Sequence, residues 1–245
     1  MTDPSPPGSG RGPGRLETAS GLCAGLLIVS NLASTRMVEL GPLAFDGGTL
    51  VFPLTYVLGD LMTEVYGYAR ARAVIWTAFL CLGLAFLCLG LTSLLPAPEG
   101  WQGAEAWNAV MTLSPRLAAA SLLAFLTGSL VNAATLSRLK TRSPGKPPLG
   151  RFVLSSLAGE AADTLIFAAV AFLGILDGGL WLALVASNFV YKTGFEIALL
   201  PLTLWLARKA KKAEGRDPVD SGVSLSPFPW SWRRGREGSG PGSPA

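Results

Sequence analysis

The sequence predicts an all-α membrane protein, a polytopic bundle of six transmembrane helices with both termini in the cytoplasm. Of its 245 residues, 50% are hydrophobic and only 15% are charged. The apolar residues fall in long blocks, a pattern typical of integral membrane proteins. A span needs roughly 20 residues, so the chain has room for about six helices plus tails. No space remains for a sizeable soluble domain, which argues against the chemistry of a water-soluble enzyme.

Each hydrophobic block is long enough for a helix rising ~1.5 Å per residue to cross a hydrocarbon core of ~30 Å. The predicted spans cover approximately residues 20–40, 49–67, 73–95, 117–138, 152–176 and 180–207. Together they form one six-helix transmembrane domain over residues 20–210. The flanking residues, 1–19 and 211–245, are rich in Pro, Gly and Ser, and we expect a disordered cytoplasmic leader and a disordered cytoplasmic tail.

The positive charges between the blocks predict the orientation. Arg70 and Arg72 follow the second block, and further basic residues gather at 138–151 and at 208–212, whereas the alternate loops are mainly acidic. Because Lys and Arg are enriched in cytoplasmic loops, both termini and the basic loops are expected inside. We expect Arg70, Arg72 and Arg151 to anchor this cytoplasmic interface.

Several classes of protein are excluded by what the chain lacks. Histidine is absent, which removes the commonest general base, the commonest zinc ligand and any Ser-His-Asp triad. Cys23, Cys81 and Cys88 lie in apolar blocks without the spacing of a metal site or a disulfide framework. The net charge of +4 is scattered beside hydrophobic blocks instead of forming one basic face. We therefore expect no catalytic residues, metal, cofactor or nucleic-acid partner, only the lipid bilayer and a small-molecule substrate.

Ionisable side chains inside the predicted spans are the best indication of function. An ionised carboxylate within a bilayer costs at least a few kcal/mol, so such residues mark binding sites or ion pathways. Spacings of three or four place each pair on one helix face. The pairs are Asp60 with Glu64, Glu160 with Asp163, Lys192 with Glu196 and, near the outer end of the first span, Arg36 with Glu39.

The predicted depths of these groups suggest a common cavity. At ~1.5 Å per residue, Glu160, Asp163 and Lys192 lie near the bilayer midplane. Asp60 and Asn132 lie closer to the cytoplasmic ends of their spans. We expect this polar set to line a cavity that opens toward one side of the membrane.

A purely structural role for these charges is the alternative. Lys192 with Glu196 or Glu160, and Arg36 with Glu39, would then neutralise one another and hold helices together. The surplus of acid favours a ligand, since the second, fifth and sixth spans carry five carboxylates and one lysine. Some carboxylates remain for a substrate, a proton or a cation.

Aromatic rings beside the acids, Tyr56 among them, suit a flat heterocycle. A carboxylate offers two acceptors in a plane and pairs with an N–H and an adjacent amino group, as on a guanine-type edge. Packing against lipid or core is the commoner role for any single ring. Small residues four apart, Gly21 with Gly25 and Ser155 with Gly159, also indicate close helix approach, although such pairs arise by chance.

The residues 52–72, FPLTYVLGDLMTEVYGYARAR, closely resemble the hallmark of the queuosine precursor transporter family, also called the vitamin uptake transporter family. Further similarity to the family's fourth, fifth and sixth spans covers residues 121–140, 151–174 and 191–203. The resemblance implies a six-helix protein of the bacterial inner membrane that imports 7-cyano-7-deazaguanine or 7-aminomethyl-7-deazaguanine for queuosine synthesis in tRNA. It also implies an architecture like that of the substrate-binding subunits of energy-coupling-factor vitamin importers.

The resemblance implies functional positions residue by residue. They are Asp60, Glu64, Arg70, Asn132, Arg151, Ser155, Asp163, Lys192 and Glu196. We expect the substrate-binding residues among them, together with Tyr56, to be Asp60, Glu64, Asn132, Ser155, Asp163, Lys192 and Glu196. Glu160 departs from the family pattern, which has a small or polar residue before the Asp.

Two other functions remain open at this point. The chain is alternatively a substrate-binding subunit that depends on an energising module and carries a different vitamin or base. Less in keeping with the sequence is an intramembrane transferase that holds Mg²⁺ through Asp60, Glu64, Glu160 and Asp163, because no DDxxD-type cluster or dense basic phosphate site lies beside them. The oligomeric state is not predicted.

Overall fold

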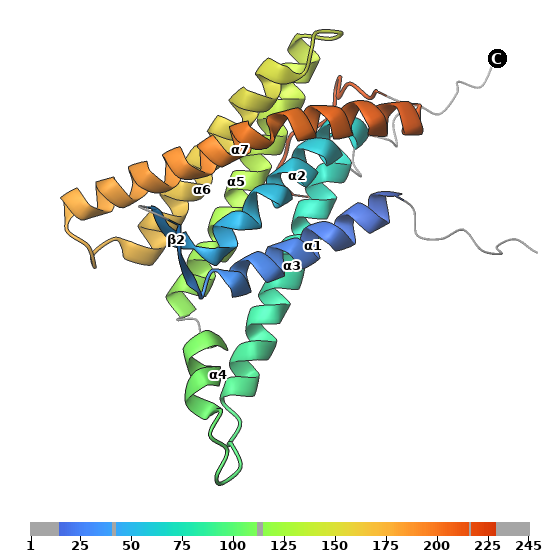
Figure 1. Ribbon diagram of the computed structural model, residues 1–245. Helices are drawn as coiled ribbons and strands as arrows, with labels where there is room; N and C mark the ends of the chain where they lie inside the picture. Colours follow the sequence, from blue (N-terminus) through green and yellow to red (C-terminus); the bar gives the residue numbers. More distant parts are fainter. Residues whose placement is uncertain (1–14, 41–42, 112–114, 216, 229–245) are drawn as a thin grey trace, which may run out of the picture.

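The structure is a computed structural model that describes residues 15–40, 43–111, 115–215 and 217–228 (Figure 1). Long helices pack into one bundle, and a short β-hairpin lies at one end of it. The elements are α1 (Arg15–Ala33), β1 (Met37–Leu40), β2 (Leu43–Asp46), η1 (Gly47–Leu50), α2 (Phe52–Tyr66), α3 (Tyr68–Ser93), α4 (Ala104–Met111), α5 (Pro115–Arg142), α6 (Leu149–Phe172) and α7 (Gly178–Glu214).

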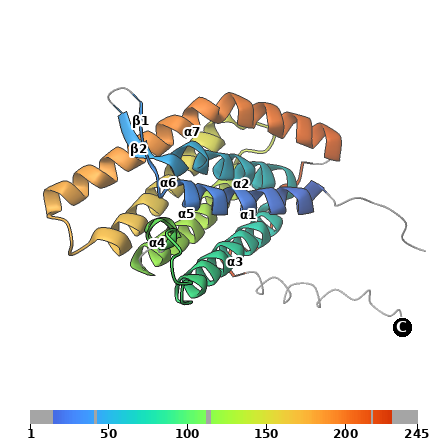
Figure 2. The same cartoon turned by 60° about the horizontal axis from the view of Figure 1, so that its bottom comes forward.

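Five helices of the described chain, α1, α3, α5, α6 and α7, are long and apolar enough to cross a membrane. The multi-pass helical class is thus confirmed, whereas the number of six spans and the orientation stay predictions. The predicted second span, α2, has only 15 residues and reaches ~22 Å. It lies in the interior between α1 and α7 (Figure 2) and also contacts α3 and α5.

The first span is shorter than predicted. Helix α1 ends at Ala33, and the chain continues into the antiparallel pair β1–β2, in which Met37 is opposite Asp46. Arg36 and Glu39 therefore do not share a helix face, so that prediction is wrong. Gly47 explains the turn, because a Cβ there would lie 2.8 Å from the Ala33 carbonyl oxygen. We call this side of the bundle the hairpin end.

The opposite side, where α2, α5 and α7 end, carries most of the basic residues, and we call it the basic end. Helix α7 continues four residues into the predicted tail, as far as Glu214. Lys211 and Lys212 in its last turn suit the negative end of the helix dipole. Gly215 ends the helix in the left-handed conformation (φ 62°).

Residues 217–228, which we call the C-terminal clasp, pack back against the turn between α2 and α3. Arg72 Nη1 donates to the Ser226 carbonyl oxygen at 2.5 Å, and Trp76 Nε1 donates to that of Pro227 at 2.8 Å. Nearer its start, Asp220 Oδ2 accepts from the backbone N–H of Tyr68 (2.9 Å) and from Ser137 Oγ (2.6 Å). Within the predicted tail, the structure thus describes residues 211–215 as the end of α7 and residues 217–228 as a packed segment.

The remaining parts of the expected leader and tail, residues 1–14 and 229–245, lie outside the described residues. Of the expected interface anchors, Arg70 is exposed, whereas Arg72 is only 1% exposed and bonds to the clasp. Gly67 separates α2 from α3 with a φ of 84°. A Cβ at this position would lie 2.7 Å from Asp220 Oδ1, so the turn needs glycine for its conformation and for the docking of the clasp.

Helices α5 and α6 cross closely at a pair of glycines. A Cβ on Gly128 would lie 2.7 Å from both Asp163 Cβ and Tyr56 Oη, and a Cβ on Gly159 would lie 2.7 Å from Asn132 Cβ. The predicted small residue Gly159 thus does mediate close approach. Gly21 and Gly25 do not, because nothing lies within 4 Å of a Cβ on either.

We expect Gly159→Ala to destabilise the protein by about 1–3 kcal/mol, because the added methyl group would force α5 and α6 apart. Thermal unfolding of the purified protein in detergent measures this effect. Gly150→Ala is the matched control on the same helix, since its Cβ would meet nothing within 4 Å. Equal stability of the two variants would contradict the close crossing.

Candidate functional site

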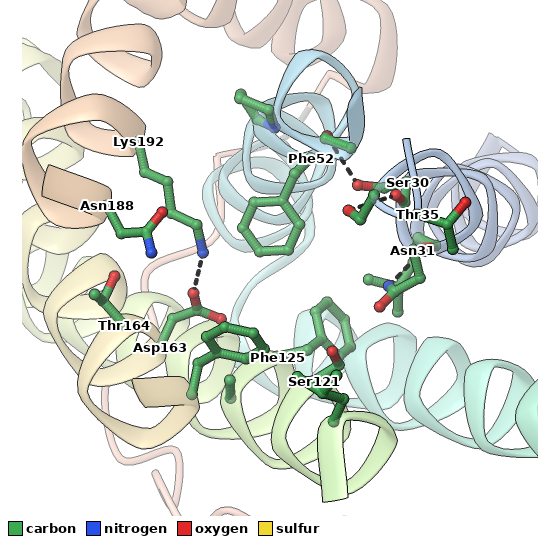
Figure 3. Close-up of a pocket in the computed structure, with 17 residues that line it drawn as sticks. Ser30, Asn31, Thr35, Phe52, Ser121, Phe125, Asp163, Thr164, Asn188 and Lys192 are labelled. Carbon is green, nitrogen blue, oxygen red and sulfur yellow. Dashed lines mark hydrogen bonds and ion pairs between the residues drawn. The ribbon is translucent and has the colours of Figure 1, made fainter. Parts of the chain in front are cut away.

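A cavity of about 260 Å³ lies between the helices toward the hairpin end (Figure 3). Five helices line it, α1, α2, α5, α6 and α7. Apolar walls with a few convergent polar groups are typical of small-molecule sites. The cavity is lined by the rings of Phe52, Phe125 and Phe167, the amides of Asn31 and Asn188, the ionic groups of Asp163 and Lys192, and the hydroxyls of Ser30, Ser34, Thr35, Ser121 and Thr164.

The polar centre of the cavity is the ion pair of Asp163 from α6 with Lys192 from α7 (Figure 3). The Asp163 side chain is 3% exposed and that of Lys192 is 21% exposed. The Lys192 Nζ also lies 4.3 Å from the centroid of the Phe52 ring and 3.9 Å from Glu160 Oε2. Lys192 thus pairs most closely with Asp163, and its longer ion pair with Glu160 is one of those that the structural alternative predicted.

A second group of polar residues, which includes the predicted Asp60, Asn132 and Glu196, lies buried beyond the cavity, toward the basic end. Asn132 Nδ2 donates to Asp60 Oδ1 at 2.7 Å, so these two residues, which were expected at similar depths, are in contact. Ser156 Oγ donates to Glu196 Oε1 at 2.5 Å. Each of these four residues is at most 7% exposed. We call Asp60, Glu160 and Glu196 the buried acids.

Several polar atoms in this buried region have no hydrogen-bond partner among the described residues. They are Tyr56 Oη, Asn132 Oδ1, Glu160 Oε2, Thr164 Oγ1, Thr193 Oγ1 and Glu196 Oε2. Two voids of about 10 Å³ lie beside them, one lined in part by Tyr56 and Asn132 and the other by Asp60, Thr193 and Glu196. Buried polar groups normally have partners, so such atoms indicate sites for a ligand or water.

Glu64 belongs to a different cluster at the basic end. Its carboxylate, 0% exposed, pairs with Arg151 and Lys211, and Lys140 Nζ lies 3.8 Å from Oε1 and donates to the Glu64 carbonyl oxygen at 2.6 Å. Although Asp60 and Glu64 are four positions apart on one helix, their carboxylates bond to different partners. Arg151, predicted as an interface anchor, is a buried counter-ion.

Asp217 of the clasp completes this cluster. Its carboxylate lies 2.5 Å from Lys140 Nζ and 2.9 Å from Lys211 Nζ. Burial alone would raise the pKa of Asp217, but the hydrogen bonds from the two lysines outweigh it and lower the pKa below its usual value. The aspartate therefore stays ionised over the neutral and mildly acidic range.

The remaining predicted residue, Ser155, is buried and donates to the Phe152 carbonyl oxygen of its own helix at 3.0 Å. It does not line the cavity. The sequence reasoning missed Asn31 and Asn188, which do. Both are amides within apolar blocks, which is the signal that identified Asn132.

A bundle of membrane-spanning helices that encloses a polar cavity is the architecture of a multi-pass membrane transporter. The family model described as "Putative vitamin uptake transporter" matches residues 46–206. The chain belongs to this vitamin uptake transporter family. The match confirms the resemblance and the transporter class, and with it the expectation that the chain is not an enzyme.

Curated bacterial proteins are similar to the chain along most of their length. A "Probable queuosine precursor transporter" of Bacillus subtilis is 30% identical over 71% of this chain and 76% of the relative. The "Queuosine precursor transporter" of Escherichia coli is 27% identical over 77% of this chain and 88% of the relative. No solved structure matches the chain significantly. Neither the energising-module alternative nor the transferase alternative gains support from these comparisons.

Proposed function

We propose that this protein imports queuosine precursors, 7-cyano-7-deazaguanine or 7-aminomethyl-7-deazaguanine, into the cytoplasm for tRNA queuosine synthesis. The names of its relatives support this substrate class. The proposal also assigns the hairpin end to the outside, as the positions of the basic loops predict. The single observation that carries the assignment is the Asp163–Lys192 ion pair in the lining of the cavity.

This pair is complementary to a guanine-type edge. Such an edge presents an amino group, an N–H and a carbonyl oxygen in a row, that is, two donors and then an acceptor. The Asp163 carboxylate supplies planar acceptors for the two donors, and the Lys192 ammonium supplies a donor for the carbonyl oxygen. Substituents at position 7 lie away from this edge, so the nitrile and the aminomethyl group leave the pairing intact.

The rest of the cavity suits one flat heterocycle. Phe52, whose ring is 4.3 Å from Lys192 Nζ, is close enough for a base held by the pair to contact it. The volume of about 260 Å³ is just below the range of ~300–1,000 Å³ for drug-sized ligands. Asn31 and Asn188 supply additional donors and acceptors for the other ring nitrogens.

Base selectivity tests the proposal. In proteoliposomes that contain the full chain, guanine-edge analogues such as 7-deazaguanine should compete with labelled 7-aminomethyl-7-deazaguanine. 7-Deazaadenine should compete at least ~100-fold less well, because its edge carries an amino donor in place of the carbonyl acceptor and leaves the ionic groups unpaired. Equal competition by both bases, or uptake of neither precursor, would contradict the proposed recognition.

A further inference from the structure

We propose that import is coupled to protons, and that the buried acids Asp60, Glu160 and Glu196 carry the coupling proton between the cavity and the basic end. This inference rests on the proposed function, because it deepens the role of the same cavity. It assigns a role to carboxylates that lie beyond the cavity, where the proposed substrate pose does not reach.

The charge of the buried region requires a further positive species. The ionisable groups that face one another here are Asp60 and Tyr56 from α2, Glu160 and Asp163 from α6, and Glu196 and Lys192 from α7. Glu64 also acts on Asp60, but its own ion pairs with Arg151 and Lys211 balance its charge. Helix α5 contributes the uncharged amide of Asn132, and α1 contributes the Cys23 thiol beside Tyr56. Four ionised carboxylates would thus face one ammonium. Since unpaired buried charges are strongly destabilising, the region has to take up protons or another cation.

The buried polar atoms that lack a hydrogen-bond partner among the described residues favour a proton over another cation. The void of about 10 Å³ beside Asp60 and Glu196 has room for about one water molecule. Thr193 Oγ1 and Glu196 Oε2, both buried and without a hydrogen-bond partner among the described residues, line this void. Among the described residues, no group of three or more acidic or cysteine side chains is arranged to hold a metal ion. A proton needs only an acceptor oxygen and a bridging water, and both fit here.

Glu160 and Lys192 connect the buried acids to the substrate. Lys192 pairs with Asp163, while its Nζ lies 3.9 Å from Glu160 Oε2. When a base occupies the acceptors of Asp163, the ammonium is held less strongly there, and a small movement pairs it with Glu160. The ammonium stabilises the ionised form of Glu160, so its carboxyl O–H breaks and the proton passes to the neighbouring Glu196 carboxylate. Glu196 lines the void that has room for a water molecule. The proton that Glu160 took up from the cavity side therefore leaves toward the basic end in the step that binds the substrate, so the proton and the substrate cross the bundle in the same direction.

Transport by the full chain in proteoliposomes tests the coupling. With labelled 7-aminomethyl-7-deazaguanine, an inward proton gradient of about one pH unit should raise accumulation by up to ~10-fold. A protonophore should abolish the gain. Exchange of label against internal unlabelled substrate, without any gradient, measures binding and translocation alone.

Variants in which a glutamate is replaced by glutamine distinguish gradient-driven accumulation from exchange. Glu160→Gln and Glu196→Gln should each lower gradient-driven accumulation at least ~10-fold more than they lower exchange, because the amide cannot carry the proton. Glu99→Gln, in an exposed loop, should retain the gradient response. A second measurement needs no variant: binding of the same base to the detergent-solubilised protein in weak buffer should release protons.

The outcomes are distinguishable. Exchange by the wild type without a response to the proton gradient, or with a response to a sodium gradient instead, would overturn proton coupling and leave the proposed substrate standing. A full gradient response in both glutamine variants, or substrate binding without proton release, would also overturn it. Absence of exchange would overturn the proposed function and this inference with it.

Discussion

Replacement of Asp163 by Asn is expected to lower uptake of 7-aminomethyl-7-deazaguanine by at least ~100-fold. The amide offers one acceptor oxygen in place of two and turns an N–H donor toward the donors of the base. It also deprives Lys192 of its ionic partner, which leaves Glu160 as the nearest carboxylate. Uptake of the labelled base by proteoliposomes measures the loss.

Glu105→Gln is the control for this variant, because Glu105 is an exposed carboxylate near the hairpin end. Both variants should reach the membrane in wild-type amounts. Near-normal uptake by Asp163→Asn at equal protein levels would show that the cavity ion pair does not hold the base. It would remove the principal support for the proposed substrate.

Replacement of Glu64 by Gln is expected to destabilise the protein by about 3–5 kcal/mol, since it leaves buried cations without their carboxylate. Arg151 and Lys140 have side chains that are only 6% and 5% exposed, so water cannot replace the lost partner. Thermal unfolding of the purified chain in detergent measures the effect, with Glu99→Gln as the control. A loss below about 1 kcal/mol would mean that Asp217 alone balances these charges.

The pH dependence of this cluster follows from Asp217. Its pKa is lowered in the folded protein, so its contribution to stability is present above the pKa that it has in the unfolded chain. That contribution disappears as the pH falls through the lower folded-state pKa. At neutral pH the clasp is therefore held by an ionised carboxylate.

The signals that the sequence carries best are polar residues in apolar surroundings. A polar group in a membrane helix is costly, so its presence indicates a function. Asp60, Asn132 and Asp163 were all recognisable for this reason. Asp60 and Asn132 were expected at similar depths, and the structure joins them by a hydrogen bond of 2.7 Å. Position along a helix is available from the sequence, since the rise per residue is constant.

Partners on other helices were less predictable. Glu64 lies on the same helix as Asp60, yet its counter-ions come from positions 76, 87 and 147 residues away. Lys140 and Arg151 looked like markers of membrane topology because they flank apolar blocks. Helix rotation and packing decide such pairs, and local spacing does not encode them. The end of α1 was missed for a related reason, because hydropathy does not distinguish the apolar strand β1 from a continuing helix.

The C-terminal clasp limits which rearrangements the bundle can make. It runs from the end of α7 to α3, where Arg72 and Trp76 hold it, and Asp220 fastens it to Ser137 of α5. If α7 moves relative to α3 and α5, it must therefore either rotate about the clasp or break the hydrogen bonds of the clasp. A shortened chain ending at Glu214 would lose the clasp, and with it this restraint on α7, while keeping every residue that lines the cavity.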